Sequence, residues 1–220
     1  MRRAPWPVSF LFGASIGLLI LLAGPLLLFN PWFVSALQAR HDVPAAFETP
    51  QAEIDRVTGE FLGDLFTDGD FDATLDGQPL LDEAERSHMG DVSRLVRILV
   101  VASLVALIVA TLCGVLLRGQ PYRMGSVLLA TASLIGAGGL VLGLVFAVAF
   151  EPAFLAFHAV FFPPGTYLFT PGSNLVTLFP EGFWFEASLI AGASVVLTAL
   201  VVLLIGLYGR RRPPTTLEAA

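Results

Sequence analysis

Four long stretches of apolar residues without a charged side chain divide this sequence. They are Val8–Phe29, Ile98–Leu117, Met124–Phe150 and Ala187–Gly209. A helix needs about 20 such residues to cross a hydrocarbon layer about 30 Å thick, so each stretch predicts a transmembrane helix. With their flanking residues, the predicted spans are about 8–36, 92–117, 124–150 and 187–209. The pattern predicts an all-α membrane protein whose four transmembrane helices form one domain over residues 1–220.

The first apolar stretch follows Arg2 and Arg3, as the apolar core of a cleavable signal peptide would. A signal core is usually about 7–15 residues long, and this stretch is clearly longer. We therefore expect it to be retained as a membrane anchor. Pro25 lies inside the stretch and predicts a kink in its helix.

The composition agrees with a membrane protein. Hydrophobic residues make up 55% of the chain and charged residues only 14%, whereas a soluble domain carries about 25% charge. The mean hydropathy is +0.78. A net charge of −6 gives no reason to expect nucleic-acid binding, and a single cysteine excludes an internal disulfide framework or a multi-cysteine metal site.

The arginines predict how the helices are oriented. Seven of them lie beside one set of predicted helix ends: Arg2, Arg3, Arg118, Arg123, Arg210, Arg211 and Arg212. Positive residues collect on the cytoplasmic side of membrane proteins, so we expect both termini in the cytoplasm. The segments 37–91 and 151–186 are then extracytoplasmic.

The two extracytoplasmic segments differ in character. In the first, apolar residues recur at helical spacing and predict an amphipathic helix over Pro50–Phe66. Nine of the eighteen phenylalanines fall between Phe150 and Phe185, and the prolines of the second segment prevent one long helix. A short helix around His158, ended by Pro163-Pro164, fits this pattern. We expect this aromatic-rich segment to lie in the membrane interface, where its simplest role is anchoring.

Two histidines fall at the same predicted membrane level. His88 lies ten residues before Ile98, and His158 lies eight residues after Phe150. Only a short connection joins the second and third spans, so these helices are neighbours and the two imidazoles can meet. Imidazole titrates near pH 6.5, and a pair of them can serve as proton acceptor and donor. His41 has no supporting pattern and is expected to be a surface residue.

Charged neighbours of His88 extend this hypothesis. Asp91 and Glu85 lie three residues to either side, where a carboxylate can orient the ring. Arg94 and Arg97 follow on the predicted outer end of the helix. They can pair with acidic residues or stabilise negative charge on an ester oxygen. The alternative is structural: an isolated interfacial histidine, with Asp91 capping the helix.

Two motifs resemble those of a known family. One is Glu85-Arg86-Ser87-His88-Met89-Gly90-Asp91-Val92, directly before a membrane helix. The other is Phe157-His158-Ala159-Val160-Phe161-Phe162, followed by Leu178-Phe179-Pro180-Glu181-Gly182-Phe183-Trp184. In order and predicted topology they resemble the lipoprotein intramolecular transacylases, four-helix proteins of the bacterial cytoplasmic membrane.

The resemblance implies an activity. Members of this family move the sn-2 acyl chain of a diacylglyceryl-modified N-terminal cysteine to its α-amine, which gives an N-acylated lyso-form lipoprotein. His88 and His158 would transfer the protons, Asp91 and Glu85 would orient or support them, and Arg94 or Arg97 would contact the oxyanion or substrate. The partners would be the lipoprotein and membrane lipid, with no nucleic acid, cofactor or metal. The active site would face outside.

Two other function classes remain open at this stage. Two histidines at one membrane level can ligate a haem for electron transfer, although such ligands are expected within the spans. A non-catalytic scaffold, with the aromatic segment as its docking surface, is the second alternative. Mutation of the histidines would leave the function of a scaffold intact.

Overall fold

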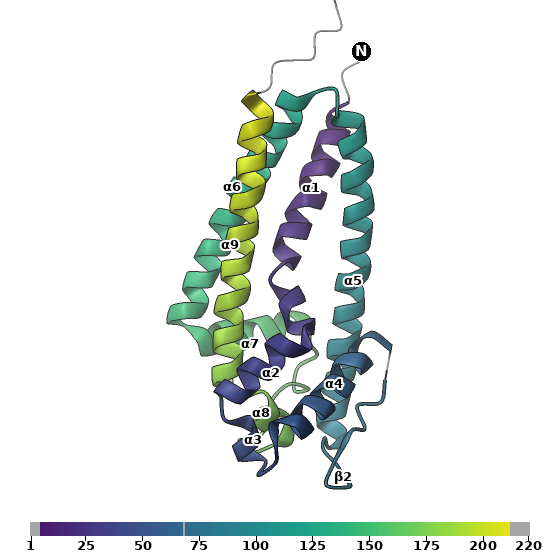
Figure 1. Cartoon of the computed structure of the whole chain (residues 1–220), viewed down its shortest axis with the longest axis vertical. Coiled ribbons are helices and arrows are strands. Elements are labelled where there is room, and N and C mark those ends of the chain that lie inside the picture. Colours follow the sequence, from purple (N-terminus) through teal and green to yellow (C-terminus); the bar gives the residue numbers. More distant parts are fainter. Residues whose placement is uncertain (1–4, 68, 212–220) are drawn as a thin grey trace, which may run out of the picture. The chain divides into compact units, whose positions relative to one another are not determined.

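The computed structural model of the chain describes residues 5–67 and 69–211 (Figure 1). Arg2, Arg3 and Arg212, which contribute to the predicted orientation, lie outside the described residues. The chain divides into two compact units. Unit 1 comprises Met1–Pro25, Val101–Gly143 and Ala191–Ala220, and unit 2 comprises Leu26–Val100 and Leu144–Ile190.

Long apolar helices make up unit 1. Among the described residues, three helices are long and apolar enough to cross a membrane: α5 (Glu83–Leu117), α6 (Pro121–Val148) and α9 (Glu181–Arg211). Each is one continuous helix that also contributes residues to unit 2 (Figure 1). The three predicted spans at 92–117, 124–150 and 187–209 fall within or nearly within these helices. The all-α prediction is confirmed, and three of its four spans have suitable helices.

The first predicted span differs from the prediction. Helix α1 (Trp6–Leu22) has 17 residues, and a 3-10 turn, η1 (Pro25–Phe29), follows it before α2 (Pro31–Arg40) begins. The range 8–36 is therefore not one continuous helix, and a span over it stays a prediction. Pro25 has no N–H to donate, so the break occurs where a kink was expected. Asn30 then caps α2, since its Oδ1 accepts a hydrogen bond from the Trp32 amide at 3.0 Å.

Small residues allow the helices of unit 1 to pack closely. Phe12 of α1, Leu117 of α5 and Leu128 of α6 share one buried cluster. Gly125 of α6 lies against the backbone of α9, where an added Cβ would be 2.5 Å from the Gly206 carbonyl oxygen. Many large apolar side chains elsewhere on these helices are exposed, for example Leu134 at 73%. Such an exposed apolar surface suits contact with lipid rather than water.

Short helices and one hairpin make up the rest of unit 2. They are α2, α3 (Val43–Ala46), α4 (Gln51–Thr67), β1 (Thr74–Leu75), β2 (Gln78–Pro79), α7 (Phe150–Phe161) and α8 (Asn174–Leu178). The predicted amphipathic helix is confirmed as α4, which buries Ile54, Val57, Phe61 and Leu65. The predicted short helix around His158 is confirmed as α7. The antiparallel β1–β2 hairpin was not predicted, because strands of two residues carry no periodic pattern.

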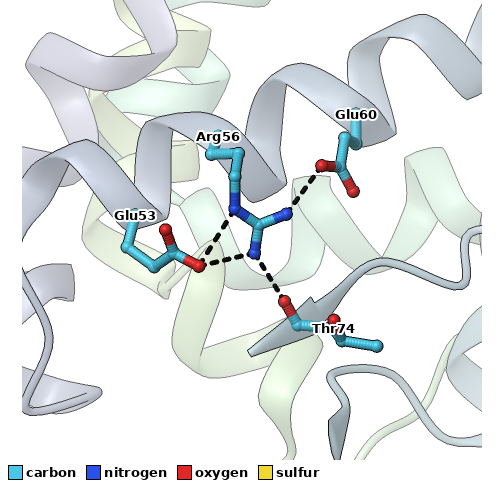
Figure 2. A network of polar contacts seen from close by, with 4 residues as sticks. All are labelled: Glu53, Arg56, Glu60 and Thr74. Carbon is cyan, nitrogen blue, oxygen red and sulfur yellow. Dashed lines mark hydrogen bonds and ion pairs between the residues drawn. The ribbon is translucent and has the colours of Figure 1, made fainter. Parts of the chain in front are cut away.

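The polar face of α4 holds the hairpin in place. Arg56 donates hydrogen bonds to Glu53 and Glu60 on its own helix, both at 2.6 Å, and to the Thr74 carbonyl oxygen of β1 at 2.6 Å (Figure 2). A single guanidinium thus joins α4 to the segment that leads into α5. This segment matters because α5 carries His88.

We expect Gly125→Ala to destabilise the protein, because the added methyl group would collide with the α9 backbone. Overpacking of this kind costs about 1–3 kcal/mol, or a loss of about 2–12 °C in Tm for a chain of this length. Gly138→Ala in the same helix is the matched control, since its Cβ would meet open space. Thermal unfolding in detergent micelles measures both; equal Tm values for the two variants would contradict this packing.

Candidate active site

The structure brings the two predicted imidazoles together. His88 on α5 and His158 on α7 have ring centroids 6.0 Å apart, with ring planes inclined by only 25°. Both residues belong to unit 2. His88 is only 6% exposed and precedes the apolar part of α5, which begins at Ile98. Two histidines separated by 70 positions in the sequence therefore form one stacked pair.

Aromatic side chains enclose the pair. The rings of Phe162 and Phe169 lie edge-on against His88, with centroid distances of 4.9 and 5.6 Å. Phe154 and Tyr167 lie against His158, at 4.2 and 5.3 Å. Phe162 also contacts His158, at 5.4 Å. These rings come from the segment that the sequence analysis expected to be an interfacial anchor, and here they cover the histidines.

A backbone contact fixes the tautomer of His158. Its Nδ1 lies 2.8 Å from the Phe154 carbonyl oxygen, one helical turn earlier in α7. A carbonyl oxygen can only accept a hydrogen bond, so Nδ1 must carry the hydrogen. In the neutral ring the lone pair is then on Nε2, and this nitrogen can accept a proton.

His88 has an unsatisfied polar atom. Its Nδ1 is buried and has no hydrogen-bond partner among residues 5–67 and 69–211. Buried polar atoms are nearly always paired, so an exception needs a reason. Beside a second imidazole, a nitrogen reserved for a bound molecule or an ordered water is such a reason.

Burial keeps both imidazoles in their neutral form. It lowers the pKa of His88, and a positive charge on His158 would lower it further, while the Asp91 carboxylate acts in the opposite direction. Burial also lowers the pKa of His158, partly offset by the hydrogen bond to the Phe154 carbonyl group. The unperturbed value is about 6.5, so both rings are free bases at neutral pH.

Glu85 lies near the site but holds the backbone. Its side chain is buried, and its two oxygens accept hydrogen bonds from the Leu175 amide at 2.8 Å and the Asp82 amide at 2.9 Å. Asp82 in turn accepts a hydrogen bond from the Glu85 amide, which completes a capping box at the start of α5. Glu85 therefore joins α5 to α8 and makes no hydrogen bond to Nδ1 of His88.

Asp91 acts on His88 through its charge, and it also pairs with Arg94 at 3.2 Å. Both side chains line a groove of about 300 Å³. The other lining residues are Leu95, Ile98, Val160, Phe161, Phe162 and Pro163. Phe162 contacts both imidazoles, so this largely apolar groove runs beside the histidine pair. Arg97 is half-buried further along α5.

The third histidine has a separate set of contacts. His41 Nε2 lies 3.2 Å from a Glu186 carboxyl oxygen, and Arg40 pairs with the other oxygen of Glu186. The imidazole also packs closely on Gly182. It is 25% exposed in its side chain and is thus partly enclosed rather than a free surface residue. Within the described part of the chain, no group of three His, Cys, Asp or Glu side chains is arranged to hold a metal ion.

The fold and the site define a class: a helical membrane protein in which a buried and a half-buried histidine lie together among aromatic rings. The family model of the lipoprotein intramolecular transacylase Lit matches residues 10–184. The chain belongs to this family. Its motifs around His88 and His158 both fall inside the matched range.

Solved structures show the same fold. The lipoprotein intramolecular transacylase Lit of Bacillus cereus superposes with a TM-score of 0.79 over 92% of this chain and 94% of that chain, at 19% identity. Two histidine variants of the same enzyme superpose with TM-scores of 0.74, also at 19% identity. An uncharacterized protein of Aquifex aeolicus (strain VF5) is 28% identical over 136 residues, or 61% of this chain. The aligned region spans 60% of that relative's length.

We expect Glu85→Ala to destabilise the protein, because the Leu175 and Asp82 amides would lose their acceptor. Each buried donor left without a partner costs about 1–3 kcal/mol. Glu83→Ala is the matched control, since Glu83 is an exposed acid in the same helical turn, and a change within about 0.5 kcal/mol is expected there. Thermal unfolding in detergent compares the two variants. An unchanged Tm for Glu85→Ala would contradict the stabilising role of these two hydrogen bonds.

We expect acyl transfer to continue at pH values just below 6.5. The pKa values of both histidines are lowered, so the rings stay unprotonated there. The acid limb of the pH–rate profile then lies below 6.5, where falling pH protonates the rings. Asp91→Asn removes a charge that raises the pKa of His88, so the pKa of His88, followed by NMR, should move to a still lower value. Asp55→Asn, on the exposed face of α4, is the control. A His88 pKa that stays in place or rises in Asp91→Asn would refute this influence of Asp91.

Proposed function

We propose that this protein transfers the sn-2 acyl chain of a diacylglyceryl-modified N-terminal cysteine to the α-amine of that cysteine. The product is an N-acylated lyso-form lipoprotein. The observation that carries the proposal is the stacked His88–His158 pair in a member of the transacylase family. Family membership also favours this reaction over the haem and scaffold alternatives.

The chemistry of the substrate supports a site built from bases. The α-amine is itself the nucleophile, so the protein needs no serine or cysteine for attack. An α-amine has a pKa of about 8, so a fraction of it is neutral at neutral pH. The neutral amine attacks, and a base must then accept the proton that its nitrogen gives up as the C–N bond forms. His158, with the lone pair on Nε2, supplies that base.

In the first step, the amine nitrogen attacks the ester carbonyl carbon, and a C–N bond forms. The carbonyl electron pair moves to oxygen, and the nitrogen passes a proton to Nε2 of His158. In the second step, the bond between the carbonyl carbon and the glyceryl oxygen breaks, and the imidazolium returns the proton to that oxygen. His88 hydrogen-bonds the glyceryl oxygen and stabilises it as it leaves.

The surroundings of the pair support this reaction in two ways. Water in the site would divert the ester to hydrolysis, and the phenylalanine rings around both imidazoles exclude water. The groove beside the pair is lined by Leu95, Ile98 and Val160, which suit an acyl chain. At its rim, the Asp91–Arg94 pair is proposed to contact the polar part of the substrate; Arg97 is proposed as a further substrate contact.

We also propose that both termini are cytoplasmic and that the active site faces outside the bacterial cytoplasmic membrane. The described arginines support this orientation. Arg118 directly follows α5, Arg123 lies in the first turn of α6, and Arg210 and Arg211 end α9. His88 lies at the opposite end of α5, among residues that precede its apolar part. The substrate's peptide portion is then in the external water, and its acyl chains are in the membrane.

We expect His88→Ala and His158→Ala each to reduce acyl transfer by about 100-fold or more, since proton transfer and oxyanion contacts typically contribute that much. His41→Ala is the control, and its activity should remain near that of the unmodified protein. The transfer is intramolecular and leaves the mass unchanged, so tandem mass spectrometry must locate the acyl chain on nitrogen or on glycerol. An equal loss in all three variants, or no N-acylated product with the unmodified protein, would count against the proposal.

A further inference from the structure

One aromatic residue around the histidine pair carries a hydroxyl group. Tyr167 lies in the segment between α7 and α8, and its ring centroid is 5.3 Å from that of His158. The remaining rings that contact either imidazole belong to Phe154, Phe157, Phe162 and Phe169. Within the described ranges 5–67 and 69–211, Tyr167 thus brings the sole phenol into ring contact with the pair.

The hydroxyl of Tyr167 has no hydrogen-bond partner among residues 5–67 and 69–211. The residue is half-buried, and its O–H makes no hydrogen bond in the part of the chain that the structure describes. A tyrosine hydroxyl in partly buried surroundings usually finds a hydrogen-bond partner. By contrast, the hydroxyl of Tyr122 on α6 accepts a hydrogen bond from Arg210 at 3.2 Å. An unpaired phenol beside a base is therefore available to a bound molecule.

The reaction creates a need for such a donor. When the amine attacks the ester, negative charge develops on the former carbonyl oxygen. The phenylalanine rings around the imidazoles offer only C–H groups to that charge. Arg94 is paired with Asp91, and its side chain is 70% exposed, so water screens it. A fixed O–H donor in a dry site stabilises an oxyanion far more than it would in water.

We propose that Tyr167 is a catalytic residue that donates a hydrogen bond to the oxyanion of the tetrahedral intermediate. This inference rests on the proposed function. The phenol keeps its proton throughout. The amine proton goes to Nε2 of His158 and then to the glyceryl oxygen, when the bond between that oxygen and the carbonyl carbon breaks. The carbonyl re-forms as the oxyanion returns its electron pair.

The first test is Tyr167→Phe, which keeps the ring and removes one oxygen atom. We expect kcat to fall by about 10²–10³-fold, the effect of losing one oxyanion donor, with KM changed by less than about threefold. Tyr122→Phe, also a loss of one hydroxyl, is the matched control and should keep its activity. The assay is acyl transfer to nitrogen on a synthetic diacylglyceryl lipopeptide in detergent micelles.

A second test separates hydrogen-bond donation from packing. The chain has three tyrosines, so Tyr122→Phe combined with Tyr208→Phe leaves Tyr167 as the single one. Growth on 3-fluorotyrosine then places a more acidic phenol of nearly the same size at this position. Because an ionised phenol cannot donate, the basic limb of the pH profile for kcat should move to lower pH. A phenol that only packs would leave this limb in place.

The outcomes distinguish this inference from the proposed function. If the unmodified protein forms no N-acylated product, the proposed function fails. If it forms product and Tyr167→Phe does so at the same rate, the role of Tyr167 is overturned. If Tyr167→Phe unfolds, the fluorotyrosine protein decides: a shifted basic limb supports donation, and an unshifted limb overturns it.

Discussion

The buried contact of Glu85 with two backbone amides is the constraint on which the site depends. The carboxyl group accepts hydrogen bonds from Asp82 and Leu175, so it fixes the first turn of α5 and the start of α8 together. His88 lies one helical turn after Glu85, so the hydrogen bonds of Glu85 also fix the position of His88. The segment 154–169, whose aromatic rings contact the two histidines, is followed by α8. The hydrogen bond to the Leu175 amide therefore also fixes the end of this segment. A local capping motif thus sets a long-range geometry.

The aromatic rings around His88 and His158 determine the protonation state of both histidines. Phenylalanine rings against both imidazoles remove water, and desolvation disfavours the charged form of a histidine more than any other influence here. The rings that would otherwise anchor the protein in the interface therefore serve a second purpose. They keep the imidazoles neutral, and in the proposed reaction they also protect the ester from hydrolysis. The exclusion of water and the neutral form of the imidazoles thus both follow from the abundance of phenylalanine in this segment.

The sequence predicted those features that depend on the periodicity of apolar residues or on a simple spacing along the chain. The buried stripe of α4, the end of α7 at Pro163 and the proximity of His88 and His158 all follow from helical periodicity and from the ends of the apolar stretches. The partners of Glu85 did not, because Leu175 is 90 positions away and its free amide depends on the start of a five-residue helix. The contact of Tyr167 with His158 could not be predicted, because Tyr167 lies in an irregular segment, where spacing does not indicate which ring faces the site.

The electrostatics of the pair match the proton balance of the proposed reaction. A charge on His158 lowers the pKa of His88, and two cations stacked 6.0 Å apart in a dry site repel each other. The pair therefore holds one proton at most near neutral pH. Acyl transfer from oxygen to nitrogen removes one proton from the neutral amine and returns one to the alcohol, with no net gain or loss. A site that stored two protons would keep the amine protonated, and one that held none would leave the departing oxygen charged. Repulsion between two imidazolium cations thus limits the site to one proton, which is the number that the proposed reaction transfers.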